Sequence, residues 1–291
     1  MPAEVSREEM EATARRARRE IVKTIALARA GHLGGPLSAV DILTALYFRV
    51  LHVRPEEPGW PERDRFVLSK GHSSVALYAV LALRGYFPLA ELASFDAVDS
   101  RLQGHPDMTA LPGLDMSSGS LGLGFSAAVG IALGAKLAGR SFTTFVMVGD
   151  GECNEGTIWE GAHVAHRHRL DNLVVIVDEN GLQQFCWRGP GPGERRALRP
   201  YDGSELSGRW AAFGWRVLEV DGHDIDAVTA TLEEARRPTG LPVAVLARTV
   251  KGKGVSFMED DYLWHSRVPT DDELRQALDE LSDPAPTTGA G

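Results

Sequence analysis

Short apolar runs alternate with helical patterns through the second half of this chain of 291 residues. The runs at 142–148 and 173–177 are apolar along their whole length, and a helical pattern at 155–169 separates them. Strands that are apolar on both faces are typical of parallel sheets covered by helices on both sides. The sequence therefore predicts the α/β fold class with a mostly parallel sheet. Further strands are expected at 65–69, 215–220 and 243–250, and further helices at 205–213, 224–236 and 270–281.

A helical region precedes these elements. Ser6 and Glu9 have the spacing of a capping box, and the helix that they begin is expected to end at Gly31. A loop should follow at 31–36, after which Ser38 is predicted to cap a second helix that runs to about position 51.

A third helix is expected at 73–85, and a glycine-rich segment at 113–124 leads into a helix of small residues. We expect a single domain over residues 1–282 that includes the N-terminal helical region. The last residues, 283–291, consist of Pro, Thr, Gly, Ala and Asp and are predicted to form a disordered tail.

Composition limits the possible partners and compartment. The net charge of −9 argues against nucleic-acid binding, because a polyanion needs a basic surface. No apolar run is long enough to cross a membrane, and the N-terminus lacks the apolar core of a secretion signal. Two cysteines exclude a disulfide scaffold. A soluble, cytoplasmic protein is the expectation.

The most specific pattern is Gly149-Asp150-Gly151 directly after one predicted strand, with Asn180 after the next. Consecutive strands of a parallel sheet are often neighbours, so Asp150 and Asn180 are expected to converge at the carboxyl edge, where ligands bind. Free N–H groups at the start of the helix that follows suit a phosphate. A carboxylate, an amide oxygen and a backbone carbonyl form part of a shell for Mg²⁺ or Ca²⁺, which a diphosphate and water would complete.

Either half of this pattern alone is an ordinary turn. The 28 residues between Gly151 and Asn180 are enough for one helix and one strand, which makes the pair far more specific. Gly149-Asp150-Gly151 followed by Asn180 resembles the thiamine diphosphate fingerprint of the transketolase family. The resemblance implies that thiamine diphosphate is the cofactor, bound beside Gly149 and Gly151. It also implies that Asp150, Asn180 and the carbonyl of Leu182 hold Mg²⁺, with Ca²⁺ as an alternative.

Four histidines add further points of resemblance to the transketolase family. They lie in the segments Gly-His-Leu-Gly-Gly, Ser-Lys-Gly-His, Gln-Gly-His-Pro and Leu-Trp-His-Ser, at His32, His72, His105 and His265. A single loop histidine is more often structural, but all four match transketolase motifs. The resemblance implies that His32, His105 and His265 handle substrate oxygens, that His265 also contacts the cofactor, and that His72 lies near the diphosphate. Histidine suits proton transfer near neutral pH.

Further positions are implied by the same resemblance. The segment 118–124 resembles the loop that contacts the thiazolium and pyrimidine rings, with Gly119 and Leu121 as cofactor-binding residues. Glu155 matches a glutamate that meets its two-fold mate between cofactor sites, although an ordinary helix-surface glutamate is the competing interpretation. Cys153 is interpreted as a filler residue. Ser266-Arg267 replaces the glycine-lysine usual after the histidine at 265.

The resemblance spans residues 7–270 and covers only the diphosphate-binding half of a transketolase. It implies a C-terminal, pyrimidine-binding partner subunit, in an α₂β₂ assembly, that supplies the glutamate activating the cofactor. The function implied is transfer of a two-carbon ketol unit between sugars or sugar phosphates. The alternatives are another thiamine diphosphate carboligation, either similar to 1-deoxyxylulose-phosphate synthase or part of specialised metabolism, and a non-catalytic scaffold subunit.

Overall fold

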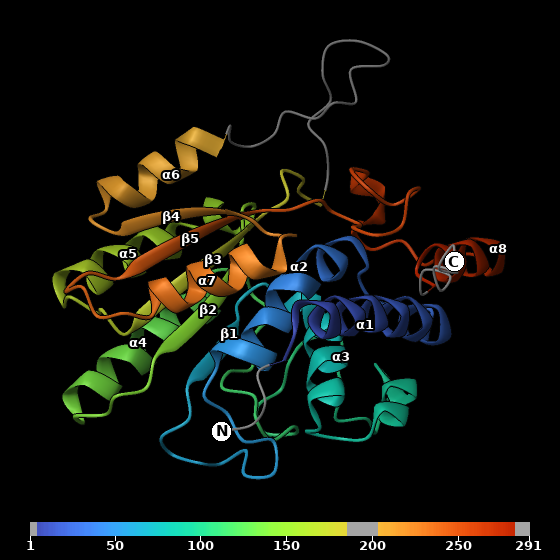
Figure 1. Ribbon diagram of the computed structural model, residues 1–291, viewed down its shortest axis with the longest axis horizontal. Coiled ribbons are helices and arrows are strands. Elements are labelled where there is room, and N and C mark those ends of the chain that lie inside the picture. The colour runs from blue at the N-terminus through green and yellow to red at the C-terminus, as the bar shows by residue number, and fades with distance from the viewer. Residues whose placement is uncertain (1–4, 185–202, 283–291) are drawn as a thin grey trace, which may run out of the picture.

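The computed structural model describes residues 5–184 and 203–282, which form a parallel sheet with helices on both faces (Figure 1). The five strands lie in the order β1-β2-β3-β5-β4, and every neighbouring pair is parallel. The α/β prediction is therefore confirmed. The strands are β1 (Arg65–Leu68), β2 (Thr144–Gly149), β3 (Leu173–Glu179), β4 (Arg216–Asp221) and β5 (Val243–Arg248).

The helices also follow the predicted pattern within a few residues. The capping box at Ser6 is present, with the Ser6 hydroxyl accepting the backbone N–H of Glu9. The helices are α1 (Arg7–Ala28), α2 (Gly34–Ala45), α3 (Ser74–Arg84), α4 (Leu123–Leu137), α5 (Gly156–Arg167), α6 (Gly203–Ala212), α7 (Ile225–Ala235) and α8 (Asp271–Glu280).

The two faces of the sheet bury two separate cores. Alternate residues of a strand point to opposite faces, so Val174 and Ile176 of β3 contribute to the core under α1, α2, α3 and α7. Val175 and Val177 contribute to the core under α4, α5 and α6. The continuously apolar strands of the sequence are explained by this double burial. Helix α8 packs beside α1, away from the sheet (Figure 1).

The start of α2 differs from the prediction. The helix begins at Gly34 rather than after Ser38, so part of the expected loop is helical. Pro36 is compatible with this position because the first helical turn does not need its N–H. The Ser38 hydroxyl does not cap a helix terminus. It lies within α2, where it donates to the carboxylate of Asp178 at 2.6 Å.

The pairing of β2 with β3 places the predicted motifs together. Gly149 pairs with Asp178 in the register of the two strands. The residues that follow, up to Asp150 and Asn180, therefore leave the sheet at the same carboxyl edge. None of the helices in the described part of the chain has the length and apolarity that crossing a membrane requires. Cys186 and the predicted tail lie outside the described residues.

Candidate active site

A cavity of about 410 Å³ lies at the carboxyl edge of the sheet, where β2 and β3 end. The structure brings the predicted site residues together around it, with one exception. His105 is not among the lining residues, but a Cβ added at Gly119 would lie 3.2 Å from its ring, so the exposed side chain of His105 lies beside a residue that lines the cavity. The predicted residues that line the cavity are His32, His72, Gly119, Leu121, Gly149, Asp150, Gly151, Glu155, Asn180, Leu182 and His265.

Asp150 is a buried carboxylate in the turn that follows β2. Its two oxygens accept the backbone N–H groups of Gly151 at 2.7 Å and Gly181 at 2.6 Å. Burial, together with the negative charge of Asp178, raises the pKa of Asp150 to about 7, although these N–H groups act to lower it. A cation in the cavity would stabilise the ionised carboxylate.

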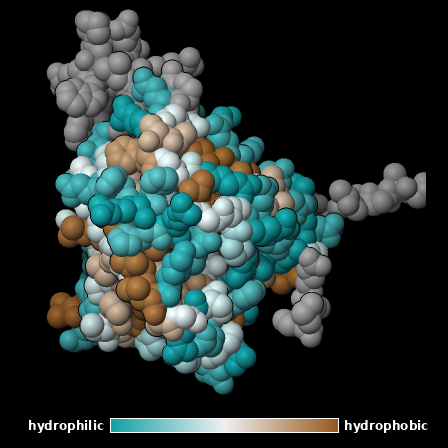
Figure 2. Space-filling model, turned by 90° about the vertical axis from the view of Figure 1, so that its left-hand side faces the viewer, coloured by the Kyte–Doolittle hydropathy of each residue, from teal (hydrophilic) through white to brown (hydrophobic). Residues whose placement is uncertain are grey.

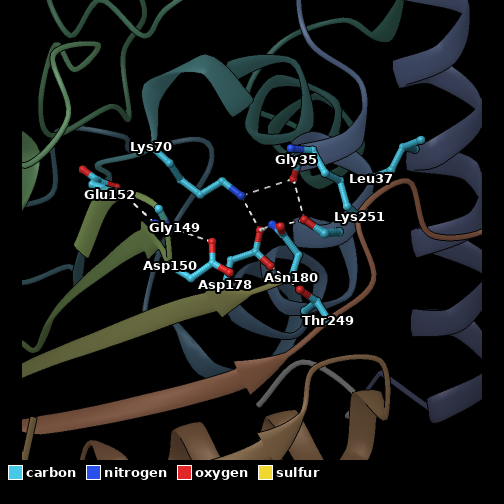
Figure 3. Close-up of polar contacts among 12 residues, drawn as sticks. Gly35, Leu37, Lys70, Gly149, Asp150, Glu152, Asp178, Asn180, Thr249 and Lys251 are labelled. Atoms are coloured by element: carbon cyan, nitrogen blue, oxygen red, sulfur yellow. Dashed lines mark hydrogen bonds and ion pairs between the residues drawn. The ribbon is translucent and has the colours of Figure 1, made fainter. Parts of the chain in front are cut away.

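Asn180 is held from two sides. Its amide nitrogen donates to the carboxylate of Asp178 at 3.3 Å, and its amide oxygen accepts the backbone N–H of Leu182 at 3.1 Å. These contacts fix which end of the side-chain amide is the acceptor. The amide oxygen of Asn180 and the carboxylate of Asp150 thus lie at the ends of adjacent strands (Figure 3).

Asp178 is fully buried beneath this edge and collects several donors. It pairs with the ammonium of Lys70 and accepts the hydroxyl of Thr249 (Figure 3). It also accepts the hydroxyl of Ser38. Burial alone would raise the pKa of Asp178, but the Lys70 ammonium and these hydrogen bonds lower it below its ordinary value. The ammonium of Lys70 also donates to the carbonyl of Gly35 at 3.3 Å and lines the cavity.

The four predicted histidines form one cluster. His32 lies at its centre, with ring centroids 5.1 Å from His72, 5.2 Å from His265 and 6.4 Å from His105. Burial lowers the pKa of His32 to about 4 and that of His265 to about 3, with Lys251 adding to both shifts. Burial and Lys70 lower the pKa of His72 well below its ordinary value. These three imidazoles are therefore neutral at pH 7.

Lys251 determines the tautomer of His265. Its ammonium donates to Nδ1 of His265 at 2.9 Å and to the carbonyls of Leu182 and Gln183 at 3.2 Å each. Burial lowers the pKa of Lys251 to about 8, so it is mostly charged at pH 7. An ammonium only donates, so Nδ1 of His265 accepts and the ring proton is on Nε2. A carbonyl has two lone pairs, so Leu182 has one left for a metal.

The remaining predicted positions lie at the rim or behind it. Leu121 is half-buried, and Glu155 is exposed at the start of α5. Cys153 is fully buried, and burial raises the pKa of its thiol well above the ordinary value, which makes it unreactive. Arg267 lies over the ring of Trp264 at 4.3 Å and pairs with Glu273 of α8 at 2.5 Å.

Sequence reasoning did not single out several polar residues that line the cavity or lie directly beneath it. Asp178 and Glu152 lie within two residues of the predicted metal ligands, and Lys70 lies within a histidine motif. Their position next to a predicted motif was the only sequence signal for these residues. No sequence pattern indicated that their side chains point towards the cavity. The residues missed are Ser38, Lys70, Glu152, Asp178, Thr249, Gln183 and Lys251.

The donor set fits a divalent cation that also binds a phosphate. Within the described ranges there is no group of three or more His, Cys, Asp or Glu side chains that would hold a metal alone. Asp150, Asn180 and the Leu182 carbonyl supply only oxygen ligands, which suits Mg²⁺ when phosphate and water complete the shell. Lys70 and Lys251 line the same cavity. Fold and site together are typical of a protein that would hold a diphosphate through a divalent cation at the edge of a parallel sheet.

Comparison with known proteins identifies the family. The sequence pattern of the family described as transketolase, thiamine diphosphate binding domain, matches residues 10–285. The chain is 44% identical over 251 residues to the 6-deoxy-6-sulfo-D-fructose transketolase subunit SqwG of Clostridium sp. (strain MSTE9), covering 86% of this chain and 88% of the relative. It is 42% identical over 283 residues to an apulose-4-phosphate transketolase subunit of Actinobacillus succinogenes, covering 97% of this chain and 99% of the relative.

Comparison with solved structures also identifies transketolases as similar proteins. The transketolase of Campylobacter jejuni superposes with a TM-score of 0.85 at 29% identity, covering 95% of this chain and 43% of that chain. The present chain thus spans less than half of this transketolase. The chain belongs to the transketolase family of transferases, and its cofactor is thiamine diphosphate.

Proposed function

We propose that this chain is the diphosphate-binding subunit of a split transketolase that transfers a two-carbon ketol unit from a ketose or ketose phosphate to an aldose acceptor. The observation that carries this proposal is the cluster of four histidines beside the Asp150 and Asn180 edge. Two relatives that match over most of their length are named as transketolase subunits, which supports a separate partner chain. Low cysteine content supports a reducing compartment such as the cytoplasm.

In this proposal, Asp150, Asn180 and the carbonyl of Leu182 hold Mg²⁺, which joins the protein to the diphosphate. Gly149 and Gly151 allow the backbone to approach the phosphates closely. Lys70 and Lys251 offset the negative charge that enters the cavity. Thiamine diphosphate, when bound, supplies the carbanion and the electron sink for carbon–carbon bond cleavage.

The histidines bind and orient the sugar. A neutral imidazole donates at one nitrogen and accepts at the other, so it can contact both hydroxyl and carbonyl oxygens. His265 presents an Nε2–H donor because Lys251 occupies Nδ1. His32 and His105 are proposed to take hydroxyl protons or return them, and His72 to contact the diphosphate. The partial burial of His32, His72 and His265 strengthens their hydrogen bonds.

Gly119 and Leu121 are proposed to pack beside the rings of the cofactor. A Cβ at Gly119 would make a tight contact of 3.2 Å with the ring of His105, so a side chain there would have to displace that ring. Glu155 is proposed to contact a second copy of this chain. Its exposure at the start of α5 leaves it accessible to such a contact.

A partner and a two-fold assembly complete the proposal. We propose a C-terminal, pyrimidine-binding subunit in an α₂β₂ complex. An exposed apolar stripe on α4 supports contact with another chain. Leu123 and Leu137 are 53% and 81% exposed, and a Cβ added at Gly130 or Gly134 would meet no atom within 4 Å beyond its chain neighbours and the backbone of its own helix. These residues and Ala127 repeat at intervals of four and three, which is the spacing of a packed helix seam.

The surface of the molecule is consistent with such a contact. Figure 2 looks at the side where the ends of α4 and α5 lie in Figure 1, and it shows apolar side chains gathered among hydrophilic ones. Val164 of α5 adds 38% of its surface to the exposed apolar area. Exposed apolar patches of this kind mark interaction sites.

The test is a ketol-transfer assay with thiamine diphosphate and Mg²⁺. This chain and the co-encoded C-terminal subunit are assayed separately and then together. Xylulose 5-phosphate and ribose 5-phosphate serve first, and then the sugars in the relatives' names, 6-deoxy-6-sulfo-D-fructose and apulose 4-phosphate. Activity only in the mixture is expected. Activity of this chain alone contradicts the split enzyme, and absence of cofactor binding by the mixture contradicts the catalytic role.

A further inference from the structure

Glu152 is a buried carboxylate of the cavity to which the proposed function assigns no role. It is 2% exposed and lies in the turn after β2, two residues beyond Asp150 (Figure 3). Burying an ionised carboxylate is costly unless hydrogen bonds replace its water. The hydrogen bonds of Glu152 therefore indicate its structural role.

Three donors from three different elements point at this carboxylate. Oε1 accepts the hydroxyl of Ser69 at 2.5 Å and the backbone N–H of Gly122 at 2.7 Å, and Oε2 accepts the backbone N–H of Gly149 at 3.1 Å. Ser69 follows β1, Gly122 precedes α4 and Gly149 ends β2. One side chain thus joins three segments that are far apart in the sequence.

The segment before α4 depends on this junction. Gly122 has a φ of +83°, in the left-handed region that favours glycine. The Ser69 hydroxyl that donates to Glu152 also accepts the backbone N–H of Phe125 at 3.0 Å, which is one of the free N–H groups of the first helical turn. Leu121 and Gly119 therefore belong to a segment whose end is fixed against the turn that carries Asp150.

We propose that Glu152 is a positioning residue that holds the segment 118–122 in place to receive the cofactor. The inference rests on the proposed function, because Gly119 and Leu121 are expected to contact the rings while Asp150 binds the metal. Glu152 fixes the distance between these two halves of the cofactor site. All three of its partners donate, so the carboxylate is needed as an acceptor on both oxygens.

The test is the nearly isosteric variant Glu152→Gln. In this variant an amide NH₂ group replaces one of the two carboxylate oxygens. The NH₂ group cannot accept a hydrogen bond, so at least one of the three donors loses its acceptor. We expect the Kd for thiamine diphosphate, measured by calorimetry at saturating Mg²⁺ on the complex with its partner subunit, to rise about ten- to a hundredfold. At saturating cofactor, kcat is expected to fall less than about threefold, since Glu152 does not touch the substrate.

Asp64→Asn is the matched control. Asp64 is also 2% exposed and accepts the backbone N–H groups of His52 and Thr143 at 2.8 and 2.9 Å, but it lies at the opposite, amino end of β1. This variant is expected to lose thermal stability and to keep the Kd for the cofactor within about twofold of the wild type. An equal rise of Kd in both variants would reduce Glu152 to a general structural role and overturn the proposal.

Amide hydrogen exchange, measured on the full chain without cofactor, is a second and independent test of the proposal. The amide of Gly122 is expected to exchange about tenfold faster in Glu152→Gln than in wild type, and unchanged in Asp64→Asn. Unchanged exchange at Gly122 in Glu152→Gln overturns the proposal. If the wild-type complex binds no thiamine diphosphate, the proposed function fails, while exchange at Gly122 still decides whether Glu152 holds this segment.

Discussion

The carboxylate of Asp150 accepts the backbone N–H of Gly181 at 2.6 Å, which joins the turn after β2 to the turn after β3. The two residues are brought together by the parallel pairing of Gly149 with Asp178. This contact makes a single site out of two turns that are ordinary on their own. The carboxylate and the Asn180 amide then lie at one cavity, as the proposed metal site requires.

Removing His105 should weaken sugar binding and leave the cofactor in place. His105 is exposed beside Gly119 and does not line the cavity that contains Asp150 and Asn180. His105→Asn is expected to raise the KM of the donor sugar about tenfold, as for the loss of one hydrogen bond. His52→Asn is the control, because the His52 side chain is 69% exposed and does not line the cavity. A larger change in cofactor Kd than in KM would contradict this assignment.

The tautomer of His265 is testable without any assay of activity. Because Lys251 donates to Nδ1, nitrogen-detected NMR of the labelled chain should show a neutral ring with its proton on Nε2 at pH values above about 5. Lys251→Met removes the donor and should release this preference. A wild-type ring protonated on Nδ1, or doubly protonated near pH 6, would contradict the arrangement.

The fold and the convergence of Asp150 with Asn180 were predictable because each depends on short-range signals. Apolar strands with helices between them require a parallel sheet, and strand ends in such a sheet converge. The start of α2 was not predictable in this way, because Ser38 resembles an N-cap in sequence. In the structure its hydroxyl is used by Asp178, which is 140 positions away in the chain. Tertiary contact overrode a local preference.

The buried polar network under the site was equally hidden. Lys70, Asp178 and Glu152 are charged residues, and charged residues are expected at the surface by default. They are buried here because each finds partners from other elements, such as Ser69 and Gly122 for Glu152. Such partnerships form only when distant segments fold together, so no local pattern reveals them.

The neutral histidine cluster should make the chain sensitive to acid. The pKa of His32 is lowered to about 4 from 6.5, so the unfolded state takes up a proton first as pH falls. The stability that His32 contributes is present above pH 6.5 and is lost as pH falls towards 4. For this partly exposed ring, the loss by about pH 5 is about 1 kcal/mol after allowance for solvent screening.

The measurement is chemical denaturation of wild type and His32→Gln at about pH 8 and about pH 5. The wild type should lose more stability than the variant between the two conditions, because glutamine does not titrate. Equal losses, or a larger loss in the variant, would show that His32 is not held neutral by burial.

A charge on the α4 stripe should halve the assembly. Leu137→Glu places a carboxylate at the most exposed leucine of the stripe, and burying it against a second copy is unfavourable. Light scattering of the complex with the partner subunit should then give about half the wild-type mass. Leu27→Glu, on α1 with 64% exposure, is the control and should leave the mass unchanged. An unchanged mass for Leu137→Glu would place the two-fold contact elsewhere.

The most direct test of the account is the Mg²⁺-dependent affinity for thiamine diphosphate of the complex that carries Asp150→Ala. We predict that this affinity falls at least about a hundredfold and that ketol transfer falls with it, because the only carboxylate among the proposed metal ligands is lost. The cofactor-free chain should keep its fold, since burial that raises the pKa of Asp150 to about 7 makes its charge unfavourable there. Wild-type affinity and activity in Asp150→Ala would contradict the central claim.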